Sequence, residues 1–424
     1  MSLHFKYHTE ANTSHQTFSN DFLTKIRSEF IKIIDNPEFG FFHLTDKKEY
    51  LASTKKILEK HTRKKHFVQI GIGGSALGPQ MLVSSLGKKS NKTFTLLDNI
   101  DSDYVYDELE KINLKDSLFY VVSKSGGTAE TIACYIIVKN LLIKEGIAEE
   151  KMKDYFVFCT EEGQGQLRDH VTKNQYDSLV VPNDVGGRFS VLTHVGLLPA
   201  LFFDIDIDKL YAGANALKEN LISTNTQANN LLQTAAHIAY LYIEKEQPIN
   251  QTVMMPYSSK LKDFSFWFVQ LWAESLGKWS DAKQKHMGIT PIPAYGATDQ
   301  HSQMQLFMEG PQDKLMFMMH IKKRDHDFSL KNDLDFKSAE LLSTHGLNEL
   351  MQAEYNGSIK ALIENKRNII EIELEKLNEE SLGGLILFFE SLTALIGYYL
   401  SIDPFNQPGV EKGKIYAFEY LNSL

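Results

Sequence analysis

The first part of the chain, from about residue 46 to residue 205, alternates short apolar runs with segments of helix length. The apolar runs are rich in β-branched and aromatic residues, which is typical of buried strands. We expect strands at residues 67–70, 94–97, 118–122, 156–159 and 179–181. Such alternation predicts an α/β domain with a doubly wound parallel sheet, and these sheets bind ligands at the carboxyl ends of their strands.

From about residue 206 to residue 250 the pattern becomes helical, because apolar residues recur three and four positions apart. A second alternating unit follows, and we expect its strands and main helix at 252–255, 314–319, 369–372 and 262–278. The stretch 288–300 contains two glycines and two prolines. We expect it to be a loop without regular structure, and such loops in compact domains are often functional.

These patterns divide the chain into five expected parts. They are an N-terminal helical segment (1–45), a first α/β domain (46–205), a helical connector (206–250), a second doubly wound α/β domain (251–402) and a C-terminal helix (403–424).

One run, from Gly383 to Leu400, is nearly all apolar and about long enough to cross a bilayer. Glu390 interrupts it and no cluster of Lys or Arg follows, so we expect a buried core helix instead. The N-terminus lacks the features of a signal peptide, and the only two cysteines, Cys134 and Cys159, fall within apolar patterns. This usage suits a reducing compartment, and we expect a cytoplasmic protein.

Composition narrows the range of partners. The chain has 424 residues, 43% of them hydrophobic, and a formal net charge of −9. An acidic chain is not expected to bind nucleic acid or an anionic membrane as its main partner. An anionic small substrate would therefore need a local basic pocket.

Three short glycine-rich or hydroxyl-rich stretches are candidate anion sites. They read Gly-Ile-Gly-Gly-Ser at 71–75, Ser-Lys-Ser-Gly-Gly-Thr at 123–128 and Val-Gly-Gly-Arg-Phe-Ser at 185–190. The first two follow expected strands and precede helical patterns, so backbone N–H groups and hydroxyls gather at a helix N-terminus. Lys124 and Arg188 supply positive charge, and this combination favours a phosphate group.

These stretches have two other interpretations. Gly71, Gly73 and Ala76 also fit a dinucleotide-binding motif, with Asp98 closing the next strand. A pyrophosphate binder, however, has no need for a second hydroxyl-rich loop. Serine and threonine are also common helix caps, but three hydroxyls in one short loop exceed what capping requires.

Glu274 lies in an unusual place on the expected helix 262–278. It shares one helical stripe with Trp267 and Leu271, and Gln270 lies one turn before it. A partly dry environment raises the pKa of a carboxyl group toward the range in which a general base acts. The alternative is an ordinary ion pair with Lys278 at i+4.

Two further residues, His301 and Lys414, are candidates for a functional role, and both lie close to glycines in the sequence. His301 follows the expected loop 288–300, at its junction with a helix, and Lys414 lies just after the expected start of the C-terminal helix. A single histidine among the 14 in the chain is more commonly a surface or core residue, but a position at a loop-to-helix junction favours a functional role. A lysine in the place of Lys414 would normally be solvated.

Taken together, the motifs resemble those of the glucose-6-phosphate isomerase family, in the same order and at similar intervals over about residues 66 to 414. Beside the three anion loops, the resemblance rests on Glu-Ser-Leu-Gly-Lys at 274–278, Gly-Ala-Thr-Asp-Gln-His at 296–301 and Gln-Pro-Gly-Val-Glu at 407–411 with Lys414. The phosphate loop departs from many longer members, which have a further hydroxyl and an aromatic residue where this chain has two glycines.

The resemblance implies two sugar-isomerase-type α/β domains, a cytoplasmic homodimer with shared active sites, and no metal or cofactor. It implies the interconversion of glucose 6-phosphate and fructose 6-phosphate through a cis-enediol, in glycolysis and gluconeogenesis.

The resemblance also implies roles for single residues. Glu274 would carry the proton between C1 and C2, Arg188 would stabilise the enediolate, and His301, from the partner subunit, would promote ring opening. Lys414 would contact the sugar at its ring oxygen or hydroxyls, and Gln270 would line the sugar. The remaining residues expected at the substrate, chiefly at its phosphate, are Gly74, Ser75, Ser123, Lys124, Ser125 and Thr128.

Two alternative functions stay open at this point. A sugar-phosphate sensor would keep the loop 123–128 but has no reason to retain Glu274, His301 and Lys414 together. An isomerase of broader scope would also accept mannose 6-phosphate.

Overall fold

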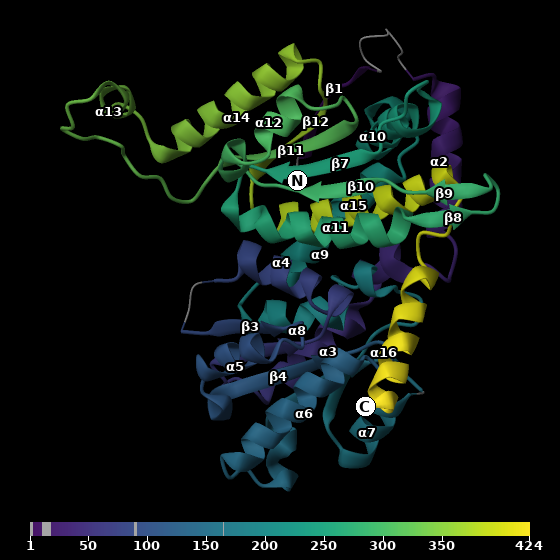
Figure 1. Cartoon of the computed structure of the whole chain (residues 1–424), viewed down its shortest axis with the longest axis vertical. Helices are drawn as coiled ribbons and strands as arrows, with labels where there is room; N and C mark the ends of the chain where they lie inside the picture. Colours follow the sequence, from purple (N-terminus) through teal and green to yellow (C-terminus); the bar gives the residue numbers. More distant parts are fainter. Residues whose placement is uncertain (1–2, 11–17, 89–90, 164) are drawn as a thin grey trace.

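The computed structural model describes residues 3–10, 18–88, 91–163 and 165–424. The chain forms two α/β parts, one above the other, and each is built around a five-stranded sheet (Figure 1). The α/β fold class predicted from the sequence is confirmed.

The first sheet is parallel throughout, with the strand order β3-β2-β4-β5-β6. Its strands are β2 (His66–Ile70), β3 (Thr93–Leu97), β4 (Ser117–Val122), β5 (Phe156–Thr160) and β6 (Asp177–Val180). All five expected strands are present, and each differs from its predicted bounds by only one or two residues at either end.

Helices cover both faces of this sheet. Residues of α3 (Lys48–Glu59) and α8 (His194–Phe202) pack on one face. The other face is covered by α5 (Ser102–Glu110), α6 (Ala129–Lys144) and α7 (Gln166–Asn174). All six residues of β4 are buried, as expected for a central strand of a sheet that is covered on both sides.

The second sheet has the order β1-β12-β11-β7-β10. Four strands are parallel: β7 (Gln251–Pro256), β10 (Thr290–Pro293), β11 (Lys314–Lys323) and β12 (Asn368–Lys376). On one face lie α12 (Met304–Glu309) and α14 (Leu347–Glu364). The other face packs on α11 (Lys262–Leu276) and α15 (Glu379–Leu400).

Two strands of this sheet differ from expectation. The stretch 288–300, predicted to be an irregular loop, contains the edge strand β10, which tolerates Pro291 and Pro293 because one side of an edge strand needs no N–H donors. The N-terminal segment, predicted to be helical, begins with β1 (Leu3–His8), which pairs antiparallel with β12, and only then forms α2 (Asn20–Ile34).

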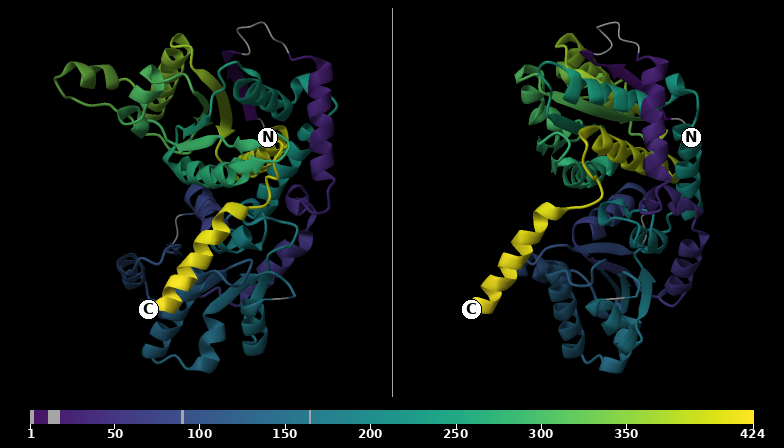
Figure 2. Two further views of the ribbon diagram at one scale, coloured as in Figure 1. Left: turned by 45° about the vertical axis from the view of Figure 1, so that its right-hand side comes forward. Right: turned by 90° about the vertical axis from the view of Figure 1, so that its right-hand side faces the viewer.

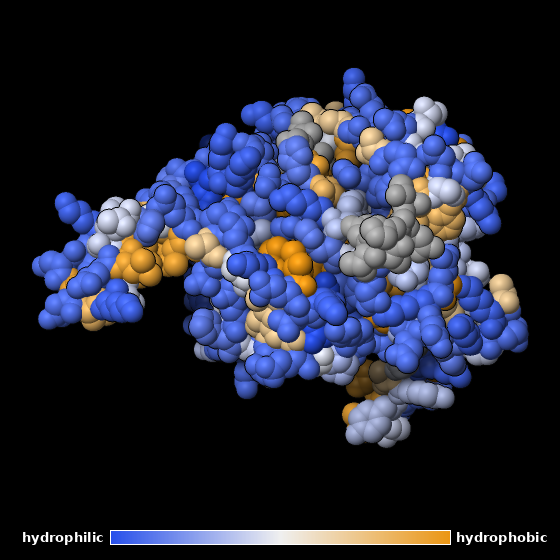
Figure 3. Space-filling model, turned by 90° about the horizontal axis from the view of Figure 1, so that it is seen from above, coloured by the Kyte–Doolittle hydropathy of each residue, from blue (hydrophilic) through white to orange (hydrophobic). Residues whose placement is uncertain are grey.

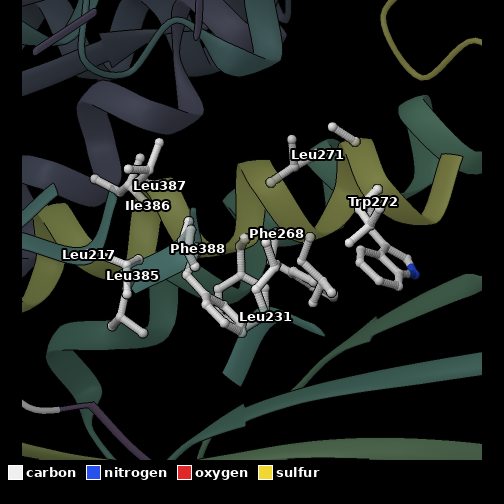
Figure 4. Close-up of a cluster of buried hydrophobic side chains, with 14 of the residues drawn as sticks. Leu217, Leu231, Phe268, Leu271, Trp272, Leu385, Ile386, Leu387 and Phe388 are labelled. Atoms are coloured by element: carbon white, nitrogen blue, oxygen red, sulfur yellow. The ribbon is translucent and has the colours of Figure 1, made fainter. Parts of the chain in front are cut away.

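The largest core lies between the two sheets (Figure 4). There α15 packs against α11, α9 (Ile207–Leu221) and α10 (Asn230–Ala239). The apolar run that could have crossed a membrane is this helix, and 94% of its most apolar window is buried inside the protein. Its Gly383 is required by close packing, because a Cβ there would lie 2.0 Å from the main-chain oxygen of Leu210.

Two segments project from the body. An arm, residues 324–346, carries α13 (Lys337–Leu342) away from the second sheet (Figures 1 and 3). The C-terminal helix α16 (Glu411–Ser423) also leads away from the rest of the chain (Figure 2), and all of its residues are exposed.

Candidate active site

Two of the predicted anion loops meet at the carboxyl edge of the first sheet. The loop after β2 contains the short helix η2 (Gly73–Ser75), and it packs against η5 (Gly187–Phe189). A Cβ on Gly74 would lie 2.2 Å from the carbonyl carbon of Gly187, so only glycine allows this approach. Gly73 itself has a φ of +60°, a conformation that favours glycine.

The third loop, Ser123 to Thr128, joins β4 to α6, with Thr128 at the N-cap position. The hydroxyls of Ser123 and Thr128 are hydrogen-bonded to each other at 2.9 Å. The backbone N–H of Gly126 donates to Ser123 Oγ at 3.1 Å, and Ser125 is exposed. Since β2 and β4 are neighbours in a parallel sheet, this loop lies at the same edge as η2.

Lys124 ties this loop to the loop that carries Arg188. Its ammonium group donates to the carbonyl oxygens of Asn183 and Val185 at 2.9 and 3.0 Å. Burial lowers the pKa of Lys124 below its ordinary value. The three segments that the sequence singled out are therefore held together around one edge, by the close packing of Gly74 on Gly187 and by the hydrogen bonds of Lys124.

Arg188 is almost fully buried, with 1% of its side chain exposed. Its Nη1 donates to Glu274 Oε1 at 3.0 Å, and its Nε donates to Ser275 Oγ at 2.7 Å. Burial lowers the pKa of Arg188, while the Glu274 carboxylate favours the charged guanidinium and opposes this effect. The contact joins the first α/β part to α11 of the second.

Glu274 lies near the end of α11 with 27% of its side chain exposed. Gln270, one turn earlier, donates from Nε2 to Glu274 Oε2 at 2.9 Å, so each carboxylate oxygen has a different donor. Lys278 does not pair with this carboxylate. Its ammonium group donates to the main-chain oxygens of Glu274 and Ser275, at 3.1 and 2.8 Å, which sets aside the simple i+4 ion pair.

These groups line a cavity of about 1710 Å³. Its wall includes Gln270, Glu274, Lys278 and the segment 406–410 that leads into α16. Burial and the neighbouring Arg188 lower the pKa of Lys278 to about 8. A cavity of this kind, with a carboxylate and cations on its wall, suits a polar anionic ligand.

Several residues of the site were not assigned a role from the sequence. Gln407 accepts a hydrogen bond from Arg188 Nη1 at 3.2 Å, and the main-chain oxygens of Asn406 and Pro404 accept from Nη2. Gln407 is part of the motif at 407–411, but only the folded structure shows that this segment contacts Arg188.

The structure does not bring two expected site residues to Glu274. His301 lies in η9 (Thr298–His301) with its side chain exposed. Lys414 lies on α16, where 61% of its side chain is exposed and its ammonium group pairs with Glu411 at 2.9 Å. Within the described part of a single chain, neither side chain contacts the Arg188–Glu274 pair.

A histidine close to Arg188 in the sequence has a structural role. His194, which follows the Gly-Gly-Arg segment, is buried and bridges Val180 O at 2.7 Å and Ser53 Oγ at 2.9 Å. Burial lowers its pKa. His194 therefore joins β6 to α3 rather than contacting the cavity.

Fold and site together define a class: a doubly wound α/β enzyme whose anion loops share one edge with a carboxylate and a buried arginine. A family model described as phosphoglucose isomerase matches residues 46–424. The chain belongs to the phosphoglucose isomerase family. It is an aldose–ketose isomerase, as the sequence motifs predicted, and family membership favours the phosphate interpretation of residues 71–75 over the dinucleotide one.

Individual relatives agree with this assignment. A probable glucose-6-phosphate isomerase from Methanococcus maripaludis is 36% identical, and the match covers 99% of this chain and 94% of that protein. A glucose-6-phosphate isomerase from Carboxydothermus hydrogenoformans is also 36% identical, over 91% of this chain and 85% of that protein.

A solved structure shows the same fold over the whole chain. It is a hypothetical protein from Thermus thermophilus, with a TM-score of 0.90 and 30% sequence identity. The match covers 99% of this chain and 100% of that chain.

Proposed function

We propose that this protein interconverts glucose 6-phosphate and fructose 6-phosphate, with Glu274 as the base and Arg188 as the electrostatic stabiliser. The observation that carries the residue assignment is the 3.0 Å contact between Arg188 Nη1 and Glu274 Oε1, at the wall of a large cavity. It joins a buried, fixed positive charge to a partly exposed carboxylate.

The chemistry follows from these two groups. In the open-chain aldose, Glu274 takes the proton from C2 while the C1 carbonyl oxygen gains negative charge, which gives a cis-enediolate. The proton of the C2 hydroxyl then moves to the C1 oxygen, and return of the first proton to C1 gives the ketose with its carbonyl at C2, so no atom is gained or lost. Arg188 lowers the energy of the charged intermediate because its position is fixed before the reaction begins. Gln270 orients the Glu274 carboxylate and lines the sugar.

The loop after β4, with Ser75 and Gly74 beside it, is our proposed phosphate site. The hydroxyls of Ser123 and Thr128 are hydrogen-bonded to each other and can turn to phosphate oxygens. Ser125 adds an exposed hydroxyl, and Lys124 adds charge at the same edge. The N-terminus of α6, 16 residues long, favours a dianion at this position.

A cytoplasmic homodimer is the proposed assembly. Large apolar side chains are exposed by half or more on the projecting arm and on α16, for example Phe328, Leu341 and Tyr416. Figure 3 shows apolar surface on the arm. Exposed apolar surface of this kind marks an interaction site. We propose that the partner subunit covers part of it and contributes His301, and that Lys414 reaches the sugar once α16 is docked.

The first test is turnover of fructose 6-phosphate by the purified protein, with glucose 6-phosphate detected through a coupled dehydrogenase. Mannose 6-phosphate is assayed separately. We expect rapid turnover of fructose 6-phosphate alone. Turnover of both sugars would identify a broader isomerase, and binding without turnover would identify a sensor.

Glu274→Gln tests the proposed base. We expect normal folding, because glutamine can still accept from Arg188, and a loss of turnover of about 10²- to 10⁴-fold. Glu364→Gln, a matched change at an exposed position on α14, should leave turnover unchanged. Turnover near that of the unchanged protein in Glu274→Gln would remove Glu274 from this role.

A further inference from the structure

A second polar cavity lies in the first α/β part, away from the catalytic groups. Its volume is about 710 Å³, and it is lined by the end of α3 and the turn after it (residues 59–64), by residues 146–148, 151 and 153–155, and by Asp177. The first two segments precede β2 and β5, and Asp177 is the first residue of β6, so the cavity lies at the amino edge of the sheet. The phosphate loop is at the opposite, carboxyl edge.

Positive charge is concentrated in this cavity although the whole chain is acidic. Five basic side chains and three carboxylates line it, and the basic ones are Lys60, Arg63, Lys64, Lys151 and Lys153. Lys60 is engaged by Asp177 at 2.5 Å. Among the residues that the structure describes, Arg63, Lys151 and Lys153 form no ion pair and remain exposed.

Lys64 is the most confined of these cations. Its ammonium group lies 3.8 Å from the centre of the Tyr155 ring and donates to Lys115 O at 3.0 Å. Within the described ranges, no carboxylate oxygen lies at ion-pair distance from it. Burial lowers its pKa to about 8, although Asp116 and Asp154 oppose this. An anion bound beside Lys64 would stabilise the charged form of this partly buried ammonium group.

A second, independent observation concerns a buried histidine of the same cavity. His61 lines the same cavity and is 3% exposed, yet its Nε2 has no hydrogen-bond partner within the part of the chain that is described. The closest acidic oxygen, Asp177 Oδ2, is 3.9 Å away, beyond hydrogen-bond distance. Buried polar atoms are normally paired, so this nitrogen lacks a partner that a ligand could supply.

We propose that this cavity binds a small phosphate-bearing anion, at a site separate from the catalytic one. Arg63 can hold a phosphate through two parallel hydrogen bonds, and the lysines supply further charge. Gly146, with a φ of +85° and open space beside its Cα, leaves room for the ligand. The volume is in the range typical of small-molecule sites.

The test is a calorimetric titration of the full chain with inorganic pyrophosphate, and turnover of fructose 6-phosphate measured at the same pyrophosphate concentrations reports any pyrophosphate bound at the catalytic site. Three proteins are compared: the unchanged chain, Arg63→Glu/Lys153→Glu, and the control Lys360→Glu/Lys366→Glu, which makes the same charge change in the second α/β part. Both Arg63 and Lys153 are exposed, so their replacement leaves the core intact. Thermal unfolding and turnover confirm that each variant is folded.

We expect saturable pyrophosphate binding that weakens by about tenfold or more in Arg63→Glu/Lys153→Glu and is unchanged in the control. Absence of saturable binding to the unchanged chain would overturn the proposal. Equal weakening in both double variants would also overturn it, because the effect would then be one of overall charge.

Discussion

At the scale of single residues, each nitrogen of the Arg188 guanidinium group has at least one acceptor. Ser275 and Gln407, which accept from it, lie 87 and 219 positions away in the sequence. The residue type and the Gly-Gly-Arg motif were enough to predict a cation at the site. Its anchors could not be predicted, because no local pattern links positions so far apart.

Arg188→Ala should lower kcat by about 10²- to 10³-fold, since a fixed charge beside the intermediate is lost. It should also lower the free energy of unfolding by about 3 kcal/mol, because Glu274 and two carbonyl oxygens lose a buried partner. Steady-state kinetics and urea unfolding measure the two effects. A rise in KM with kcat unchanged would show that Arg188 only binds substrate.

Lys278 should make stability depend on pH. Its pKa is about 8 in the folded chain and near its ordinary value of 10.5 when unfolded, so between these values the unfolded chain holds more protons. The contribution of Lys278 to the free energy of unfolding therefore increases as the pH rises from about 8 to about 10.5.

Lys278→Gln should flatten this part of the stability profile, as measured by urea unfolding at several pH values. The matched change Lys360→Gln, at an exposed site on α14, should leave the profile as it is. If the stability profile of Lys278→Gln matched that of the unchanged protein, the Lys278 ammonium group would be as well solvated in the folded chain as in the unfolded chain.

At the scale of elements, the strands of the first sheet were predictable because burial on both faces requires unbroken apolar runs. The strand β10 was not predictable, since its two prolines indicate a loop and only its place at the sheet edge makes them acceptable. The helix α16 was predicted, but the exposure of its apolar side chains was not. Side chains of this kind are normally buried against another protein surface. Those exposed by half or more are Ile415, Tyr416, Phe418, Tyr420 and Leu421.

Ending the chain at Val410 removes α16 and tests this surface. We expect the truncated protein to dissociate to monomers at concentrations where the full chain is dimeric, and to lose turnover. Sedimentation velocity and the coupled assay measure these effects. Lys414→Ala is the matched comparison, because it keeps the apolar side chains and should reduce turnover while the dimer persists. A truncated chain that stays dimeric and active would exclude both proposed roles of α16.

At the scale of the whole molecule, the site lies where the two α/β parts meet. The loops of the first part hold Arg188, and α11 of the second presents Glu274. His301 belongs to the second part as well, but it does not line the cavity beside Glu274 of the same chain. In the function proposed above, His301 therefore comes from a second copy.

Mixing two inactive variants tests this arrangement. A mixed dimer contains one Glu274→Gln subunit and one His301→Ala subunit, and it has two sites. If each site takes His301 from the partner subunit, one of these two sites has both Glu274 and His301 intact. Random reassembly of equal amounts should then restore about a quarter of the activity of the unchanged protein. If His301 acted within its own chain, the mixture would remain as inactive as its components.

The sequence by itself determined the α/β class, the order of most elements, the anion loops and the family, because apolar periodicity and short motifs are local. The tertiary structure decided which distant groups meet. It paired Glu274 with Arg188 instead of Lys278, made β1 and β10 the edges of one sheet, and placed the cationic cavity at the far edge of the other. These outcomes depend on packing between segments that are far apart in the chain, and no local pattern encodes such packing.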